Sequence, residues 1–174
     1  MNDLTVKLKW NGWSRFKGIN AGGIETSIDA DRQSGPSPAE LLLEALGACA
    51  SVDVVSILEK MRTPVAKFEV TLEADRHRTE PHYLTGARML FDVWSDGITP
   101  DKLVRAINLS ISKYCGVYHF LRDDLKLPPQ FRIHATGAEA SGDYQVVEMA
   151  PPTTELDLSE VRRVAPAKSV VFSP

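Results

Sequence analysis

SGPSPAELLLEALGAC, residues 34–49, joins a loop rich in serine and proline to the longest apolar segment of the chain. Ser37 can cap a helix, and Pro38 suits the first helical position. Glu40 falls in the first turn, where the helix dipole favours an anion. Apolar residues continue beyond this stretch at helical spacing and cover more than one face. The pattern predicts a helix from about Pro38 to Met61 that is buried on more than one side.

This helix has the length of a membrane span but not the usual composition. Glu44 and Asp53 lie inside the apolar segment, together with Gly47 and two serines. Charged side chains are costly in the hydrocarbon core of a bilayer. The segment is therefore interpreted as a core helix, and no membrane partner is expected.

Period-two alternation on both sides of the helix predicts strands. The chain opens with such a run, which the tight-turn signal Asn11-Gly12 follows. The expected strands are Leu4–Trp10, Trp13–Ile19, Ile24–Ile28, Phe68–Leu72, Tyr83–Trp94 and Phe131–Ala135, and a second helix is expected from Pro100 to Cys115. Long helices between groups of strands indicate an α+β fold with antiparallel sheets, not a doubly wound parallel sheet.

Composition excludes several classes of function. The 174 residues are 43% apolar and 25% charged, which is typical of a globular protein with a real core. The net charge of −3, without a basic stripe, argues against nucleic acid as a partner. The N-terminal residues lack the basic start and apolar run of a secretory signal, so a cytoplasmic location is expected.

The composition changes near Gly137, after which Ala, Pro, Thr and Glu dominate. This change predicts one domain over residues 1–137 and a C-terminal extension or arm over residues 138–174. Two strand-like segments in the extension, Tyr144–Glu148 and Ser169–Phe172, are expected to pair with the body or with a partner subunit.

Two cysteines, Cys49 and Cys115, are the strongest candidates for chemistry. They are too few for a disulfide scaffold or a structural zinc site, and too far apart for a CxxC motif. A cysteine in an apolar helix is most often a small core residue. A reactive Cys49 needs a positive neighbour, because its unperturbed pKa is about 8.5 and the thiolate is the nucleophile. The nearest candidate is Arg32, on the loop before the helix.

Cys115 has more polar sequence neighbours, among them Lys113, Tyr114 and His119. Cys115 and His119 are four residues apart and would share a helical face, which permits a thiol–imidazole pair. A histidine that only hydrogen-bonds to backbone explains the spacing equally well. The other histidines, His77, His82 and His134, form no cluster of metal ligands, so no metal and no cofactor are expected.

Two segments together resemble the OsmC/Ohr family: Ser34–Cys49, and Ala106–Ser110 with Lys113–Cys115. The resemblance covers about residues 4–136. It implies an α+β fold with two long central helices, an intertwined homodimer and active sites at the subunit interface. It also implies that Cys49 is the peroxidatic thiol and Cys115 the resolving thiol for a small-molecule peroxide. A dithiol or a lipoylated protein would be the reductant.

Two positions differ from the hydroperoxide-reducing members of that family. Those members carry a glutamate directly after the loop proline, where this chain has Ala39, and Glu40 fills the next position. The activating arginine is represented by Arg32 or Arg15. The pattern is therefore closer to the OsmC-like branch, with Cys49, Cys115, Glu40 and Arg32 as the candidate site.

Two other functions remain open at the level of sequence. One is a noncatalytic protein that binds a small hydrophobic ligand on the same fold. The other is a cysteine hydrolase that uses Cys115 and His119, for which the sequence shows no orienting carboxylate.

Overall fold

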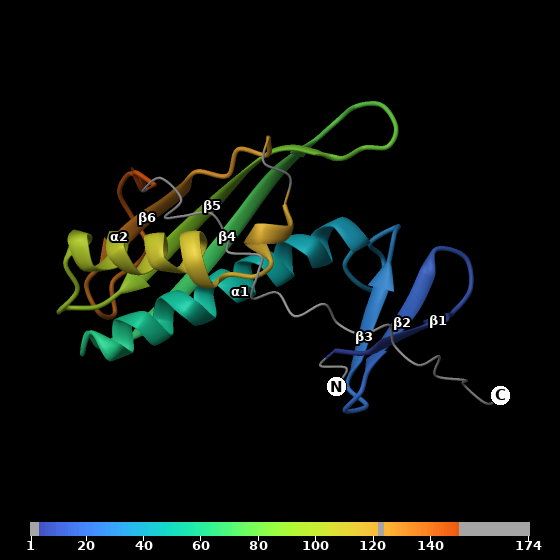
Figure 1. Ribbon diagram of the computed structural model, residues 1–174, viewed down its shortest axis with the longest axis horizontal. Helices are drawn as coiled ribbons and strands as arrows, with labels where there is room; N and C mark the ends of the chain where they lie inside the picture. The colour runs from blue at the N-terminus through green and yellow to red at the C-terminus, as the bar shows by residue number, and fades with distance from the viewer. Residues whose placement is uncertain (1–3, 122–123, 150–174) are drawn as a thin grey trace, which may run out of the picture. The chain divides into compact units, whose positions relative to one another are not determined.

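The computed structural model describes residues 4–121 and 124–149, which form two compact units, one up to Leu41 and one from Leu42 onward. Figure 1 shows the elements in chain order. They are β1 (Val6–Trp10), β2 (Arg15–Asn20), β3 (Glu25–Asp29), α1 (Pro38–Lys60), β4 (Lys67–Arg76), β5 (Leu84–Trp94), α2 (Pro100–Leu109), a π-helix (Ser110–Tyr114), a 3₁₀-helix (Tyr118–Phe120), β6 (Pro129–His134) and β7 (Gln145–Val146). The mixed α+β fold predicted from the sequence is confirmed.

The first unit is the predicted three-stranded meander. β2 lies between β1 and β3, and both pairings are antiparallel. One face of β1 is both apolar and exposed. Val6, Leu8 and Trp10 share this face, and all three side chains are exposed in the single chain. An apolar strand face without a cover inside the chain is suited to contact with another molecule.

The start of α1 is held by reciprocal hydrogen bonds between Ser37 and Glu40. The Ser37 hydroxyl accepts the Glu40 backbone N–H at 3.3 Å, and the Glu40 carboxylate accepts the Ser37 backbone N–H at 2.7 Å. This is a capping box, which satisfies donors that the first turn leaves free. The predicted helix start at Pro38 is confirmed, and Glu40 has a structural role in it.

Gly35, in the loop before α1, is expected to be required for local packing. A Cβ atom at this position would lie 2.8 Å from the Ser27 carbonyl oxygen, which belongs to the backbone of β3. We expect Gly35→Ala to lower the free energy of unfolding by about 1–3 kcal/mol, because the loop must move away from the strand. Urea unfolding curves measure this, with Gly97→Ala as the control because its Cβ would meet nothing within 4 Å. Equal stability of the two variants would contradict the expectation.

The second unit contains a four-stranded sheet in the order β4-β5-β6-β7. The sheets were predicted to be antiparallel, but in this one β6 pairs with β5 in parallel. The physical reason is that α2 returns the chain to the starting edge before β6 begins, as a crossover helix does. The second helix is also shorter than expected, since α-helical geometry ends at Leu109 and a π-helix follows.

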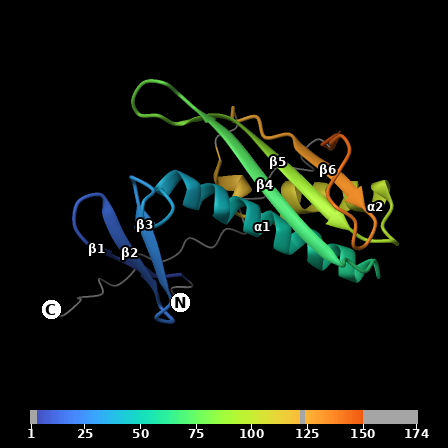
Figure 2. The same cartoon turned by 180° about the vertical axis from the view of Figure 1, so that it is seen from behind.

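Helices α1 and α2 cover the same face of this sheet (Figures 1 and 2). Leu46, Ala50, Val54 and Leu58 form the buried stripe of α1, at intervals of four residues. A Cβ on Gly47 would lie 2.5 Å from Leu72 of β4, so glycine permits close packing of the helix on the sheet.

Some apolar residues of α1 are exposed in the single chain. Val52 lies away from the buried stripe, and Leu42 continues that stripe toward the start of the helix. By length and composition, α1 is long and apolar enough to span a membrane. Its Leu46 stripe packs into the protein core, as expected of a core helix.

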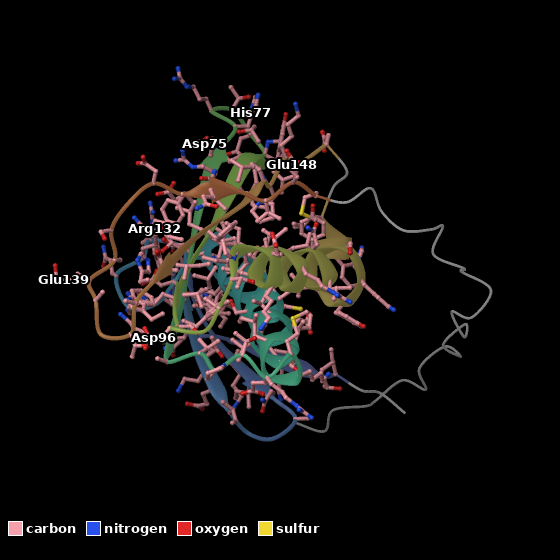
Figure 3. All side chains as sticks on the ribbon, turned by 90° about the vertical axis from the view of Figure 1, so that its left-hand side faces the viewer. Asp75, His77, Asp96, Arg132, Glu139 and Glu148 are labelled. Carbon is pink, nitrogen blue, oxygen red and sulfur yellow. The ribbon has the colours of Figure 1, made fainter. Side chains whose placement is uncertain are left out.

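The segment after β6 covers the second face of β5. The Trp94 indole donates to the carbonyl of Ala138, and the Tyr144 hydroxyl donates to Asp92. β7 pairs with β6, so the predicted segment Tyr144–Glu148 does contain a strand. Figure 3 shows Arg132 within the curve of the segment that carries Glu139. The other predicted segment, Ser169–Phe172, lies outside the described residues, and the boundary at residue 137 stays a prediction.

Candidate functional site

The two cysteines are carried by different elements of the second unit. Cys49 lies on α1 one residue before the buried Ala50, and its side chain is partly buried against the core. Cys115 ends the π-helix with extended backbone angles and is fully buried. The fold thus places a more accessible and an inaccessible thiol in one apolar cluster.

The two thiols pack in the same hydrophobic cluster, and Cys49 influences the pKa of Cys115. Burial raises the pKa of Cys115 to about 12, although a hydrogen bond from the Tyr118 backbone lowers it. A hydrogen bond with the Cys49 thiol and the charges of Cys49 and Asp53 raise it further. Cys115 is therefore a protonated thiol at neutral pH. Cys49 and Cys115 are 66 residues apart in the sequence, and the fold places both thiols in one apolar cluster.

The prediction that Cys115 lies in a polar setting is wrong. Its sequence neighbours Lys113, Tyr114 and His119 are exposed, while Cys115 turns inward between α1 and the sheet. Sequence neighbours give the wrong environment here because the chain leaves helical geometry at this residue.

The possible thiol–imidazole pair of Cys115 and His119 is also not supported by the geometry. Cys115 has φ −71° and ψ 92°, so the two residues do not share a helical face. The contact between them joins backbone atoms, with the His119 N–H 3.4 Å from the Cys115 carbonyl oxygen. This arrangement removes the base that a cysteine hydrolase would need.

Arg32 and Glu40 are close together in the first unit. The Arg32 guanidinium lies 3.7 Å from one Glu40 oxygen, and the Ser37 backbone and hydroxyl bind the other. The Ser37 backbone hydrogen bond is the main cause that lowers the pKa of Glu40, and the Arg32 charge adds to it. Arg32 has a left-handed φ of 57° and is exposed, so its guanidinium is open to another charged or polar group.

Glu40 and Cys49 lie on the same helix but cannot meet within one chain. They are nine residues apart, which corresponds to about 13.5 Å along the axis and roughly half a turn around it. The geometry of α1 therefore keeps the Glu40 side chain away from the Cys49 thiol of the same helix.

The sequence did not point to Asp53 as a neighbour of Cys115. Asp53 follows Cys49 by one helical turn, so by spacing alone its neighbour would be Cys49. In the structure its charge acts on Cys115, and the Tyr118 N–H stabilises the Cys115 thiolate form. No pattern in the sequence indicates these contacts, because they depend on how α1 packs against the end of the π-helix.

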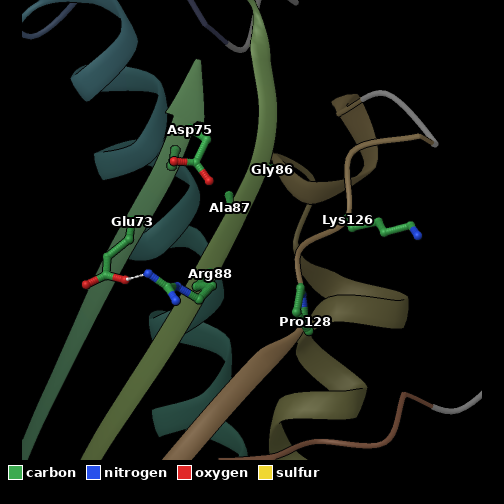
Figure 4. Close-up of a pocket in the computed structure, with 8 residues that line it drawn as sticks. Glu73, Asp75, Gly86, Ala87, Arg88, Lys126 and Pro128 are labelled. Atoms are coloured by element: carbon green, nitrogen blue, oxygen red, sulfur yellow. Dashed lines mark ion pairs between the residues drawn. The ribbon is translucent and has the colours of Figure 1, made fainter. Parts of the chain in front are cut away.

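A separate cleft of about 370 Å³ lies between the β4–β5 ribbon and residues 126–128 (Figure 4). Its lining is Glu73, Ala74, Asp75, Gly86, Ala87, Arg88, Lys126 and Pro128. Arg88 is paired with Glu73, and the Lys126 side chain points away from the cleft. None of the four candidate site residues lines it. Within residues 4–121 and 124–149, no group of three or more His, Cys, Asp or Glu side chains is placed to hold a metal ion.

Comparison with known proteins gives a consistent result. The family model described as OsmC-like protein matches residues 29–128. Protein YhfA of Escherichia coli K12 is 32% identical over 133 residues, which cover 76% of this chain and 99% of YhfA.

Solved structures share the fold. An OsmC-like protein from Mycoplasma pneumoniae has a TM-score of 0.68 at 15% identity, covering 77% of this chain and 99% of that one. An organic hydroperoxide resistance protein OsmC from Legionella pneumophila has a TM-score of 0.55 at 11% identity, covering 78% and 98%. With the family model and YhfA in agreement, this chain belongs to the OsmC-like family, on the branch represented by YhfA.

Proposed function

We propose that this protein is a thiol-dependent peroxidase that reduces organic hydroperoxides or hydrogen peroxide through Cys49 and Cys115. The observation that carries the proposal is that the two thiols share one apolar cluster with unequal exposure, Cys49 partly exposed and Cys115 fully buried. Membership of the OsmC-like family and the hydroperoxide resistance of the Legionella relative support the same chemistry.

The roles follow from exposure. The Cys49 thiolate attacks the terminal oxygen of the peroxide, the O–O bond breaks, and the alkoxide takes a proton and leaves as the alcohol. Cys49 becomes a sulfenic acid. The Cys115 sulfur then loses its proton and attacks the Cys49 sulfur, the S–O bond breaks, and the departing hydroxyl takes up a proton and leaves as water, which yields the disulfide. A dithiol reductant exchanges with this disulfide and is itself oxidised to a disulfide.

The high pKa of Cys115 suits a resolving thiol. A thiol that stays protonated in the resting protein does not compete for peroxide, since only the thiolate is a good nucleophile. Burial also protects Cys115 from direct oxidation. The two cysteines can therefore act in a fixed order.

We further propose that the working unit is a homodimer in which each Cys49 faces the Arg32–Glu40 pair of the other chain. The spacing on α1 separates Glu40 from Cys49 of the same chain, and the exposed residues Leu8, Trp10 and Val52 supply apolar surface for a second copy. A positive charge near Cys49 stabilises the thiolate. Glu40 holds the Arg32 side chain in position through their ion pair.

Arg32→Ala is expected to slow the oxidation of Cys49 by peroxide about 10-fold or more, because the thiolate loses its positive neighbour. Stopped-flow mixing with cumene hydroperoxide measures the rate over a range of pH. The dependence of the oxidation rate on pH should shift to higher pH in Arg32→Ala. In the control Arg15→Ala, this pH dependence should be unchanged. An Arg15→Ala profile that shifts instead would assign the activating role to Arg15.

The proposed activity is tested by peroxide consumption with dihydrolipoamide as the reductant. The expected result is turnover that depends on both protein and dithiol. If peroxide is not consumed and both cysteines stay reduced, the proposed activity is wrong. The alternative is then that the protein binds a small hydrophobic ligand without catalysis. Native mass spectrometry of the freshly isolated protein then shows whether such a ligand is retained, and its mass also gives the oligomeric state.

A further inference from the structure

We infer that Ser110 is a positioning residue that sets the approach of Cys115 to Cys49 during disulfide formation. This inference rests on the proposed function and names a further residue for the same site. In this role Ser110 acts on the two cysteines indirectly, through hydrogen bonds to their backbone segments. It is bonded to both segments that carry them.

The first contact reaches α1. The Ser110 hydroxyl donates to the Ala50 carbonyl oxygen at 3.0 Å, and Ser110 and Ala50 are both fully buried. Ala50 directly follows Cys49. A hydroxyl inside an apolar core is retained only where it has a partner, and this partner belongs to the helix of the peroxidatic thiol.

The second contact holds Cys115. The Ser110 carbonyl accepts the Cys115 N–H at 2.8 Å, and this is the five-residue bond of the π-helix Ser110–Tyr114. A π-turn contains one more residue than an α-turn and is frequently found at functional sites. Ser110 therefore couples the backbone of Cys115 to the backbone beside Cys49 through two hydrogen bonds.

This coupling matters for the second chemical step and not for the first. Peroxide attack needs only Cys49, whereas disulfide formation needs the Cys115 sulfur in line with the Cys49–oxygen bond. Small displacements of reacting groups can cost about 10²-fold in rate. Without the Ser110 hydroxyl, the π-turn keeps the hydrogen bond from the Cys115 N–H to the Ser110 carbonyl but loses the hydrogen bond to the Ala50 carbonyl of α1.

The experiment separates the two steps in the full-length protein. Single-turnover oxidation with one equivalent of cumene hydroperoxide is quenched at intervals, and dimedone labels the sulfenic acid while alkylation counts the remaining thiols. Ser110→Ala should form the sulfenic acid within about two-fold of the wild-type rate but close the disulfide about 10-fold more slowly or worse. Ser112→Ala is the matched control, because the Ser112 hydroxyl donates to the Asn108 carbonyl within its own helix.

Two further variants isolate the hydroxyl from the packing. Threonine and valine at this position have nearly the same shape, so Ser110→Thr should close the disulfide faster than Ser110→Val. Closure by Ser110→Ala at the wild-type rate would overturn the inference, as would equal closure by the threonine and valine variants. Closure driven by diamide, a thiol oxidant, gives the same comparison without peroxide. A wild type that closes with diamide but ignores peroxide would contradict the proposed function and leave the role of Ser110 to be judged by the diamide rates.

Discussion

Cys49→Ala is expected to reduce peroxide consumption by ~10³-fold or more, to the rate seen without protein, because no other group in the site supplies a nucleophile for the peroxide oxygen. Cys115 cannot replace it, since burial raises its pKa to about 12 and keeps it protonated. Consumption of cumene hydroperoxide with dihydrolipoamide measures the effect. Alanine is a close match in size to cysteine, so the fold should be retained.

Cys115→Ala is the informative counterpart. It should consume about one equivalent of peroxide and then stop, with Cys49 held as a sulfenic acid that adds about 16 Da to the intact mass. Excess peroxide should convert this product to the sulfinic acid. Full turnover by Cys49→Ala, or by Cys115→Ala at the wild-type rate with dihydrolipoamide as the reductant, would reverse or remove the assigned roles.

Asp92→Asn is expected to lower the free energy of unfolding by about 3–5 kcal/mol. The substitution removes the carboxylate charge that binds three hydrogen-bond donors inside the protein and leaves those donors without a matching acceptor. Asp92 is 6% exposed and accepts hydrogen bonds from Arg132 at 2.8 Å, His134 at 2.7 Å and Tyr144 at 2.6 Å. Tyr144 lies in the segment after β6, so the variant should also loosen that segment from the sheet. Urea unfolding and amide hydrogen exchange at residues 138–149 measure the two effects.

The matched control is Glu69→Gln. Glu69 lies directly opposite Asp92 on β4, but its side chain is exposed and forms an ion pair with Lys67. We expect a change within about 0.5 kcal/mol, as for other exposed pairs. If the two variants lose equal stability, the Asp92 cluster does not anchor the C-terminal segment.

The same cluster predicts a loss of stability in acid. Burial raises the pKa of Asp92, but hydrogen bonds from Arg132, Tyr144 and His134 outweigh it and lower the pKa from 3.8 to about 2. A carboxylate with a depressed folded-state pKa stabilises the fold above its unfolded pKa. About 2 kcal/mol is therefore lost as pH falls from about 4 towards 2. Asp92→Asn should not show this part of the acid transition.

The sequence predicted most of the architecture because its signals are local. The Ser37–Pro38 start of α1, the Asn11-Gly12 turn and the period of two in the strands each depend on neighbours in the chain. The parallel pairing of β6 with β5 was missed, since the direction of a strand relative to a distant partner depends on the path of α2. The π-helix was missed because Ser110–Tyr114 reads as a plain continuation of α2.

The candidate site could be predicted only as a set of residues. Residue type and family resemblance identified the two cysteines, and the structure places both in one hydrophobic cluster, while their joint role stays a prediction. Their environments could not be inferred, because the polar neighbours of Cys115 in sequence point away from it in space. Arg32 and Glu40 are brought together by a loop and a capping box, and their role towards Cys49 stays a prediction.

The most direct test of the account is to map the cysteines after oxidation of the wild-type protein with one equivalent of peroxide. Protease digestion without reduction, followed by mass spectrometry, identifies the peptides that contain Cys49 and Cys115. The account predicts that they are joined by a disulfide within one chain, that a dithiol releases both, and that the reduced protein repeats the cycle. Recovery of both peptides as free thiols, or of a Cys49–Cys49 link between chains, would contradict it.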